Sequence, residues 1–133
     1  MVARRALVTG ASSGIGEATA RLLASSGYRV VLLARSAERL EAIRAELPGE
    51  GHLVLACDLT DCEALERAFA ALGAAFSGLE LLVNNAGLGY RARVEELDDL
   101  LLERLFRTNV LGLLHASRLA LPLLRREIGR AHV

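Results

Sequence analysis

The 133-residue chain has no lysine and no tryptophan, and it contains only two cysteines and two prolines. Cys57 and Cys62, with four residues between them, are too few and wrongly spaced for a disulfide framework or a zinc site. No apolar run reaches the ~18 residues that a membrane-spanning helix needs. The sequence therefore predicts no metal site and no membrane partner.

The chain also lacks an excess of charge of either sign. Its 16 basic residues, all arginines, balance 16 acidic ones, so no strong field would attract nucleic acid or an anionic membrane. The amino terminus is basic, but Thr9-Gly10 interrupts the apolar run too early for a signal peptide. We expect a cytoplasmic protein. Because 53% of the residues are hydrophobic and no linker or repeat divides them, we expect one domain over residues 1–133.

A glycine-spaced turn is the most distinctive stretch that is present. Residues 6–8 are typical of a buried strand, the turn follows at residues 9–16, and a helical periodicity begins near Gly14. Without a Cβ atom, Gly10, Gly14 and Gly16 can adopt positive φ and let a ligand approach the backbone. The open N–H groups of the first helical turn then favour a phosphate.

The spacing of this turn does not settle its role by itself. Gly-x-x-x-Gly-x-Gly differs from the Gly-x-Gly-x-x-Gly fingerprint, and no Gly-Lys-Ser/Thr follows as it does in a P-loop. A turn with three glycines is a structural loop about as often as it is a phosphate site. Both interpretations stay open at this point.

Strand and helix patterns alternate along the rest of the chain. Apolar runs typical of buried parallel strands recur at residues 28–34, 52–57 and 79–84. Helical patterns cover 38–47 with Ser36 as the cap, run from an Asp61 cap to about Phe76, and run from about Glu95 to Arg126 in two pieces closed by Gly129. This alternation predicts an α/β fold whose parallel sheet has right-handed crossovers and helices on both faces.

Polar and glycine-containing segments follow all four predicted strands. They are Thr9–Gly16, Ala34–Ser36, Asp58–Leu59 and Asn84–Gly87. In a parallel sheet the carboxyl ends of the strands lie along one edge, and ligands bind beyond that edge. We therefore expect these four segments to share one site.

Two of these segments together resemble the short-chain dehydrogenase/reductase family: Thr-Gly-x-x-x-Gly-x-Gly at residues 9–16 and Asn-Asn-Ala-Gly at residues 84–87. Asp58 matches the family's aspartate after the third strand, and Asn109 matches its helix asparagine. The resemblance covers essentially the whole chain and favours a phosphate site at the glycine turn. It implies a Rossmann-type parallel sheet of strand order 3-2-1-4, truncated here before or at strand five.

The resemblance also implies a set of cofactor-binding residues. The glycine turn would surround the phosphates and a ribose, and Asp58 and Leu59 would meet the adenine. The segment from Asn84 to Gly87 would line the central ribose, with Asn84 also tying neighbouring strands together. Asp58 is alternatively a simple cap at the end of its strand. The full set is Thr9, Gly10, Ser12, Ser13, Gly14, Ile15, Gly16, Arg35, Asp58, Leu59, Asn84, Asn85, Ala86 and Gly87.

The end of the second strand indicates which dinucleotide is bound. A carboxylate there would bind the ribose 2′-hydroxyl of NAD, whereas this chain has Ala34 followed by Arg35. An arginine pairs well with a 2′-phosphate, and no acid stands beside it. We therefore expect NADP(H) rather than NAD(H). The alternative is that Arg35 is merely solvated at a helix start.

The catalytic part of the family pattern does not occur in this chain. The resemblance implies hydride transfer between a nicotinamide cofactor and a carbonyl or alcohol, with a serine and a Tyr-x-x-x-Lys motif after the fifth strand. Tyr28 and Tyr90 are followed, four positions later, by leucine and valine, and no histidine is placed to replace the missing groups. Asn109 alone remains as a catalytic candidate. Two hypotheses stay open: the cofactor-binding half of an NADP-dependent oxidoreductase, or a non-catalytic dinucleotide-binding module or degenerate fragment.

The last helical segment is apolar around nearly its whole circumference. It therefore needs packing partners on more than one side, and we expect a homo-oligomer formed through residues 108–126. Pro122 should kink or shorten the final turn. The resemblance implies a small carbonyl or alcohol substrate without identifying it, because most loops that shape the substrate pocket in that family follow the part that this chain resembles. Residues 87–93 either border this pocket or form a surface loop.

Overall fold

The computed structural model describes residues 3–89 and 91–128. Its strands are β1 (Arg5–Thr9), β2 (Arg29–Ala34), β3 (Leu53–Ala56) and β4 (Leu81–Val83). Its helical segments are α1 (Gly14–Ser25), α2 (Ala37–Glu46), α3 (Cys62–Ala75), the 3₁₀ turn η1 (Val94–Glu96), α4 (Asp99–Phe106), the π-helix η2 (Arg107–Gly112) and α5 (Leu113–Ile128). The predicted strands and the first three predicted helices are all present, with ends shifted by one or two residues, which is the usual uncertainty of such boundaries.

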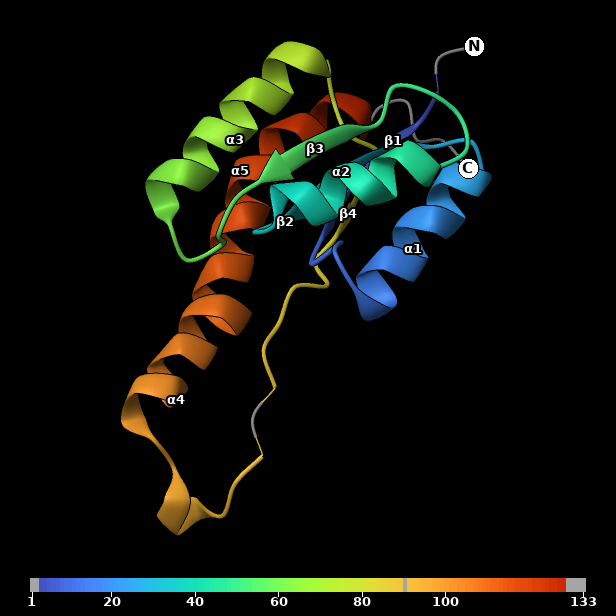
Figure 1. Ribbon diagram of the computed structural model, residues 1–133. Coiled ribbons are helices and arrows are strands. Elements are labelled where there is room, and N and C mark those ends of the chain that lie inside the picture. The colour runs from blue at the N-terminus through green and yellow to red at the C-terminus, as the bar shows by residue number, and fades with distance from the viewer. Residues whose placement is uncertain (1–2, 90, 129–133) are drawn as a thin grey trace.

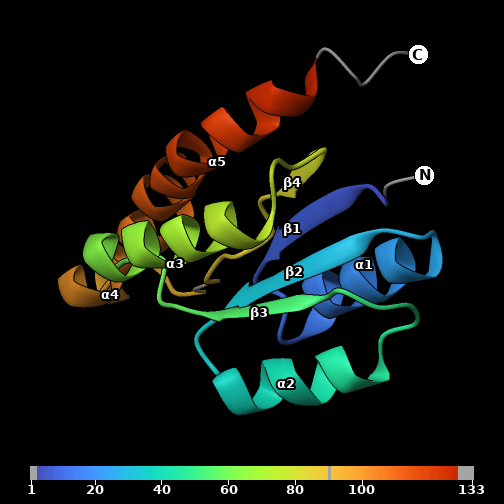
Figure 2. The same ribbon diagram turned by 90° about the horizontal axis from the view of Figure 1, so that it is seen from above.

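The four strands form one parallel sheet in the order β3-β2-β1-β4, which confirms the predicted topology. Figure 2 shows α1 and α2 on one side of this sheet and α3 and α5 on the other. Figure 1 shows that α4, with the segment that leads into it, extends away from the sheet. The carboxyl ends of the strands therefore meet near the point where this extension begins.

Alternating side chains of the two central strands build two cores. Leu7, Val31 and Leu33 cluster with apolar residues of α3 and α5. Val8, Val30 and Leu32 cluster with apolar residues of α1 and α2. Because successive side chains of a strand point to opposite faces, one continuous apolar run can supply both cores.

Side-chain caps start the helices that follow β2 and β3. The hydroxyl of Ser36 accepts a hydrogen bond from the Arg39 amide at 3.2 Å, and Asp61 Oδ1 accepts one from the Ala64 amide at 3.1 Å. Both residues are the predicted caps. Each oxygen accepts from a backbone N–H group that has no partner within the helix.

The predicted start of the last helix near Glu95 is wrong. Residues 94–96 form only the short turn η1, Leu97 is extended, and α4 begins at Asp99. Asp98 Oδ1 accepts hydrogen bonds from the amides of Leu100 and Leu101, so this residue is the true cap. A helix cannot run back through an N-cap residue, because its backbone is non-helical.

Pro122 does not shorten the helix in which it lies. The α5 helix passes through this residue and continues to Ile128, so that part of the prediction is wrong. A proline removes one backbone hydrogen bond, while Ala116, Ala120 and Leu123 hold the helix in the core on both sides of it. The predicted closing residue Gly129 lies outside the described residues. Within the described part of the chain, no helix has the length and apolar character needed to cross a membrane.

Candidate functional site

A cleft of about 740 Å³ lies at the carboxyl ends of the strands. Its volume falls within the range of small-molecule and cofactor sites. All four predicted segments contribute to it. Its lining includes Gly10, Ser12, Ser13, Gly14, Ile15, Arg35, Asp58, Leu59, Asn85, Ala86 and Gly87. Four predicted site residues, namely Thr9, Gly16, Asn84 and Asn109, are absent from the lining and take other positions described below.

The glycine turn connects β1 to α1 and needs its glycines for two different reasons. Gly10 and Gly14 have φ values of 65° and 55°, as predicted, in the left-handed region that favours glycine. Gly16 does not have a positive φ, so that part of the prediction is wrong. A Cβ atom at Gly16 would collide with the carbonyl oxygen of Gly10 and the side-chain amide of Asn85. Gly16 therefore permits close packing of α1 against the turn.

The first turn of α1 presents its amides without a side-chain cap. Ser13 occupies the N-cap position, but its side chain makes no capping hydrogen bond, in contrast to the caps of α2, α3 and α4. The backbone N–H groups of this turn stand at the edge of the cleft, beside Gly14 and Ile15. This arrangement fits a phosphate, because open amides and the helix dipole both favour an anion there.

Thr9 joins the ends of β1 and β4 from within the core. Its hydroxyl oxygen accepts hydrogen bonds from the amides of Asn85 and Ala86, both at 3.0 Å, and only 1% of Thr9 is exposed. The side chain of Asn85 also donates to the Gly10 carbonyl at 3.2 Å. Thr9 thereby places the Asn85–Gly87 segment against the glycine turn.

Asn85, and not Asn84, connects the ends of neighbouring strands β4 and β1, so the role predicted for Asn84 is wrong. The side chain of Asn84 donates a hydrogen bond from its Nδ2 to the hydroxyl of Ser117 on α5, at 3.0 Å. The two asparagines are consecutive at the end of β4, so their side chains point in different directions. Asn84 therefore connects the sheet to α5, while Asn85 connects β4 to the turn after β1.

Asp58 is both a turn residue and part of the cleft lining. Its Oδ1 accepts hydrogen bonds from the amide and the hydroxyl of Thr60 at 2.9 and 2.8 Å. Burial raises the pKa of Asp58, but these hydrogen bonds and the positive charges of Arg35 and Arg104 outweigh it, so the pKa lies below its ordinary value. The carboxylate is ionised at neutral pH. Among the described residues, Oδ2 has no hydrogen-bond partner in the protein.

Asn109 lies on the π-helix η2 and binds the segment that follows β4. Its Oδ1 accepts from the Leu88 amide at 2.8 Å, and its Nδ2 donates to the Leu88 carbonyl at 2.9 Å. A Cβ atom at Gly87 would lie 3.2 Å from this Oδ1. Leu88 lines the cleft, so Asn109 shapes the site through Leu88.

Sequence reasoning missed Arg104 and Thr108 as lining residues. Arg104 belongs to α4 and Thr108 to η2, and both line the cleft. Their approach depends on how the extended helix packs, which no local pattern shows. Tyr90 lies outside the described residues, and within the part of the chain that is described no cluster of His, Cys, Asp or Glu could hold a metal ion.

An open parallel sheet of order β3-β2-β1-β4, with a glycine turn beside a cleft at its carboxyl edge, defines the Rossmann class of fold. The sequence matches the family model described as short chain dehydrogenase over residues 4–131. The chain belongs to this family.

Three known proteins illustrate the similarity. Serine 3-dehydrogenase of Agrobacterium fabrum is 43% identical over 126 residues, which cover 92% of this chain and 49% of that protein. An alcohol dehydrogenase from Thermococcus sibiricus, complexed with 5-hydroxy-NADP, superposes with a TM-score of 0.88 at 35% identity, covering 94% of this chain and 55% of that one. A 3-ketoacyl-(acyl-carrier-protein) reductase from Brucella melitensis, complexed with NADH, has a TM-score of 0.87 at 30% identity, covering 96% and 52%. The chain thus spans about half the length of these relatives.

Proposed function

We propose that this chain is the cofactor-binding half of an NADP(H)-dependent oxidoreductase of the short-chain family. One observation carries the proposal: Arg35 and the start of α1, with its open amides, border the same cleft. The amides suit a diphosphate, which NAD and NADP share. Arg35 suits a 2′-phosphate, which only NADP carries.

The remaining lining residues have roles that fit the other parts of a dinucleotide. Asp58, ionised and with Oδ2 available, would accept a hydrogen bond from the exocyclic amine of adenine, with Leu59 beside the ring. The Asn85–Gly87 segment, held in place by Thr9, would line the central ribose. These contacts orient the bound cofactor but do not distinguish NADP from NAD.

The proposed reaction is hydride transfer between the bound cofactor and a small carbonyl or alcohol compound. The dinucleotide supplies or accepts the hydride. Asn109 is the one catalytic candidate of this chain, and its contact with Leu88 makes it a residue that shapes the site near the reacting end. The names of the relatives, which include a serine dehydrogenase and an alcohol dehydrogenase, support the reaction class and leave the substrate open.

We further propose a cytoplasmic homo-oligomer that assembles through residues 108–126 of η2 and α5, together with Phe106 of α4. Phe106, Leu111 and Leu114 are 63%, 60% and 58% exposed, and they line one groove of about 560 Å³. Exposed apolar side chains grouped in this way are typical of association surfaces. The partner that we propose for these side chains is the same surface on a second copy of the chain.

A second candidate function is dinucleotide binding without turnover. It rests on the residues that are present, since the tyrosines Tyr28 and Tyr90 are not followed by lysine four positions later and Asn109 is the one catalytic candidate among the 133 residues. The two candidates share the same cleft and differ in chemistry alone. An NADPH oxidation assay with a panel of aldehydes and ketones separates them, since turnover by the purified chain excludes the binding-only function.

Titration of the chain with NADP⁺ and NAD⁺ tests the cofactor proposal. We expect NADP⁺ to bind more tightly, and Arg35→Met to weaken NADP⁺ binding about tenfold to a hundredfold because it removes a charge-assisted contact. NAD⁺ binding should stay nearly constant in that variant. Arg44→Met is the matched control, because Arg44 pairs with Glu41 on the surface of α2, outside the cleft lining. Tighter binding of NAD⁺ than of NADP⁺ by the unaltered chain would contradict the proposal.

A further inference from the structure

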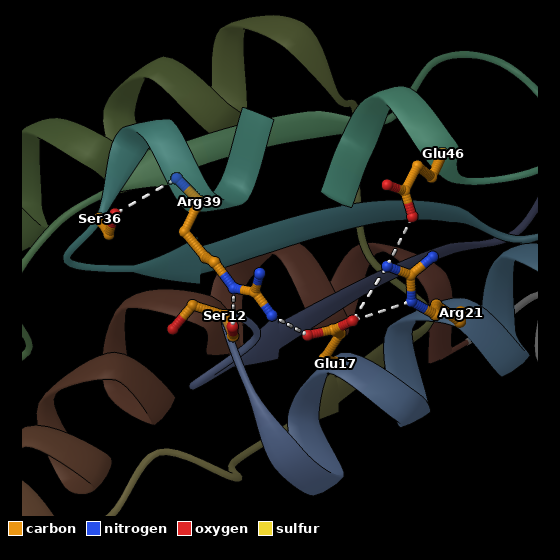
Figure 3. Close-up of polar contacts among 6 residues, drawn as sticks. All are labelled: Ser12, Glu17, Arg21, Ser36, Arg39 and Glu46. Atoms are coloured by element: carbon orange, nitrogen blue, oxygen red, sulfur yellow. Dashed lines mark hydrogen bonds and ion pairs between the residues drawn. The ribbon is translucent and has the colours of Figure 1, made fainter. Parts of the chain in front are cut away.

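Arg39 connects the first turn of α2 to the glycine turn. Its Nε donates to the Ser12 carbonyl at 2.9 Å, and its Nη2 lies 2.9 Å from Glu17 Oε1 on α1 (Figure 3). The Arg39 amide is itself held by the cap residue Ser36. The guanidinium is therefore held at two points, by the turn and by α1, while Ser36 holds the Arg39 backbone at the start of α2.

Further ion pairs, in which acidic and basic side chains alternate, extend this contact along α1 and α2. Glu17 Oε2 accepts hydrogen bonds from Nε and Nη2 of Arg21 at 3.1 and 2.9 Å, and Arg21 Nη2 lies 3.0 Å from Glu46 Oε2. Glu46 is at the end of α2, so the network joins α1 and α2 at both ends of α2 (Figure 3). Hydrogen bonds from Arg21 and the charge of Arg39 hold the pKa of Glu17 below its ordinary value, although burial opposes them.

Ser12 is the point where this network meets the cleft. It lines the cleft together with Ser13 and Gly14, whereas Arg39 is not among the lining residues. A trans peptide unit is planar, so an arginine that holds the Ser12 carbonyl also fixes the direction of the Ser13 N–H group. Arg39 can thus set the orientation of the turn without touching a ligand.

We propose that Arg39 is a positioning residue for the phosphate-binding turn, acting through the Ser12 carbonyl with Glu17 as the anchor of its guanidinium. This inference rests on the proposed binding of a dinucleotide. It gives different roles to two arginines, Arg35 and Arg39, that lie four positions apart in the sequence. Arg35 contacts the part of the cofactor that distinguishes NADP, and Arg39 orients the turn that receives the diphosphate common to both cofactors.

The test compares Arg39→Met with Arg35→Met and with the surface control Arg44→Met. We measure dissociation constants for NADP⁺ and NAD⁺. In the protein without cofactor we also measure amide hydrogen exchange at Ala11 and Glu17, whose N–H groups donate to the carbonyls of Leu33 and Ser13 at the two ends of the turn. For Arg39→Met we expect binding of both dinucleotides to weaken by the same factor, about three- to tenfold, since the pairs it breaks are partly exposed. Exchange at the turn should accelerate. Arg35→Met should weaken NADP⁺ binding alone, and Arg44→Met should change neither property.

Two further variants separate positioning from charge. Arg39→Lys should recover part of the affinity, because an ammonium group can still donate to the Ser12 carbonyl. Adding Glu17→Gln to Arg39→Met should not restore binding. Full restoration would overturn the inference, since it would show that Arg39 acts only by neutralising Glu17.

Three other results would also count against the positioning role of Arg39. A loss confined to NADP⁺ in Arg39→Met would overturn the inference by showing direct contact with the 2′-phosphate. Unchanged affinity and unchanged exchange would overturn it by showing a surface ion pair only. If the unaltered chain binds neither dinucleotide, the proposed function fails and the inference falls with it, and this result differs from a failure seen only in the Arg39 variants.

Discussion

Asn109 and Leu88 are joined by a pair of hydrogen bonds that satisfies both backbone groups of Leu88. Asn109 Oδ1 accepts from the Leu88 amide, and Nδ2 donates to the Leu88 carbonyl, at 2.8 and 2.9 Å. Only a side chain with an acceptor and a donor side by side can make this pair. The contact connects the π-helix η2 to the segment after β4, whose residue Leu88 lines the cleft.

Replacing Asn109 by aspartate should loosen this connection. The carboxylate still accepts from the Leu88 amide, but its second oxygen faces the Leu88 carbonyl without a proton to donate. We expect a loss of about 1–2 kcal/mol in the free energy of unfolding and faster hydrogen exchange at Leu88. Urea denaturation and exchange measurements check both effects. Glu103→Gln, which breaks an exposed pair with Arg107 beside η2, is the control and should leave Leu88 unaffected.

The sequence could predict the parts of this molecule that depend on neighbouring residues. Apolar runs such as 28–34 gave β2, and the caps Ser36 and Asp61 follow from residue type and position. The convergence of Arg35 and Asp58 on one cleft was predictable too, because the carboxyl ends of parallel strands share an edge. Asp98 carries the same kind of capping signal, so the start of α4 is predictable from residue type in the same way.

Other features depend on packing across the fold. Residues 84 and 85 are both asparagine, so only the strand register shows which of them reaches the Gly10 carbonyl. Arg104 enters the cleft because α4 extends beyond the sheet (Figure 1). The π-helix around Asn109 has no local signature in residue type, although π-helical turns occur frequently at functional sites.

Two helical glycines should respond to alanine in opposite directions. In Gly16→Ala the new methyl group collides with the Gly10 carbonyl and the Asn85 amide, so α1 or the turn must shift. We expect a loss of about 1–3 kcal/mol in the free energy of unfolding, as for other overpacked sites, together with weaker dinucleotide binding. In Gly73→Ala, within α3, the methyl group meets no atom within 4 Å. That variant should gain about 0.5–1 kcal/mol from helix propensity. Thermal unfolding of the two variants provides the comparison, and equal destabilisation would contradict this account of Gly16.

A buried ion cluster at the amino end of the sheet should dominate stability away from the cleft. Arg5 lies 2.9 Å from both Glu80 Oε1 and Glu127 Oε1, and Arg5 and Glu127 are each only 5% exposed. Arg5→Met leaves the buried carboxylate of Glu127 and the partly buried carboxylate of Glu80 without this cation, so we expect a loss of about 3–5 kcal/mol in the free energy of unfolding. Arg107→Met, which breaks the exposed pair with Glu103, should cost less than about 1 kcal/mol. Similar losses in the two variants would refute the importance of burial here.

The groove lined by Phe106, Leu111 and Leu114 should control self-association. Leu114→Arg places a charge among Phe106 and Leu111, so we expect the unaltered chain to form dimers and this variant to be monomeric. Leu22→Arg is the matched control, because Leu22 is 68% exposed on α1, outside the groove. Sedimentation velocity at several concentrations distinguishes the species. A monomeric unaltered chain, or dissociation by both variants alike, would exclude this groove as the contact surface.

Glu80 should contribute to the acid sensitivity of folding. Burial raises the pKa of this carboxyl, but hydrogen bonds from the side chain and the amide of Arg5 outweigh it and hold the pKa below its ordinary value of 4.5. The folded protein therefore keeps Glu80 ionised at a pH where the unfolded chain binds a proton. The resulting stability is fully present above about pH 4.5 and is lost as the pH falls through the lower, folded-state pKa. Glu80→Gln removes this contribution, so the difference in unfolding free energy between the variant and the unaltered chain should be larger at pH 6 than at pH 3. Urea titrations at the two pH values measure it, with the exposed Glu95→Gln as the control, and a difference independent of pH would show that Arg5 does not stabilise the ionised form.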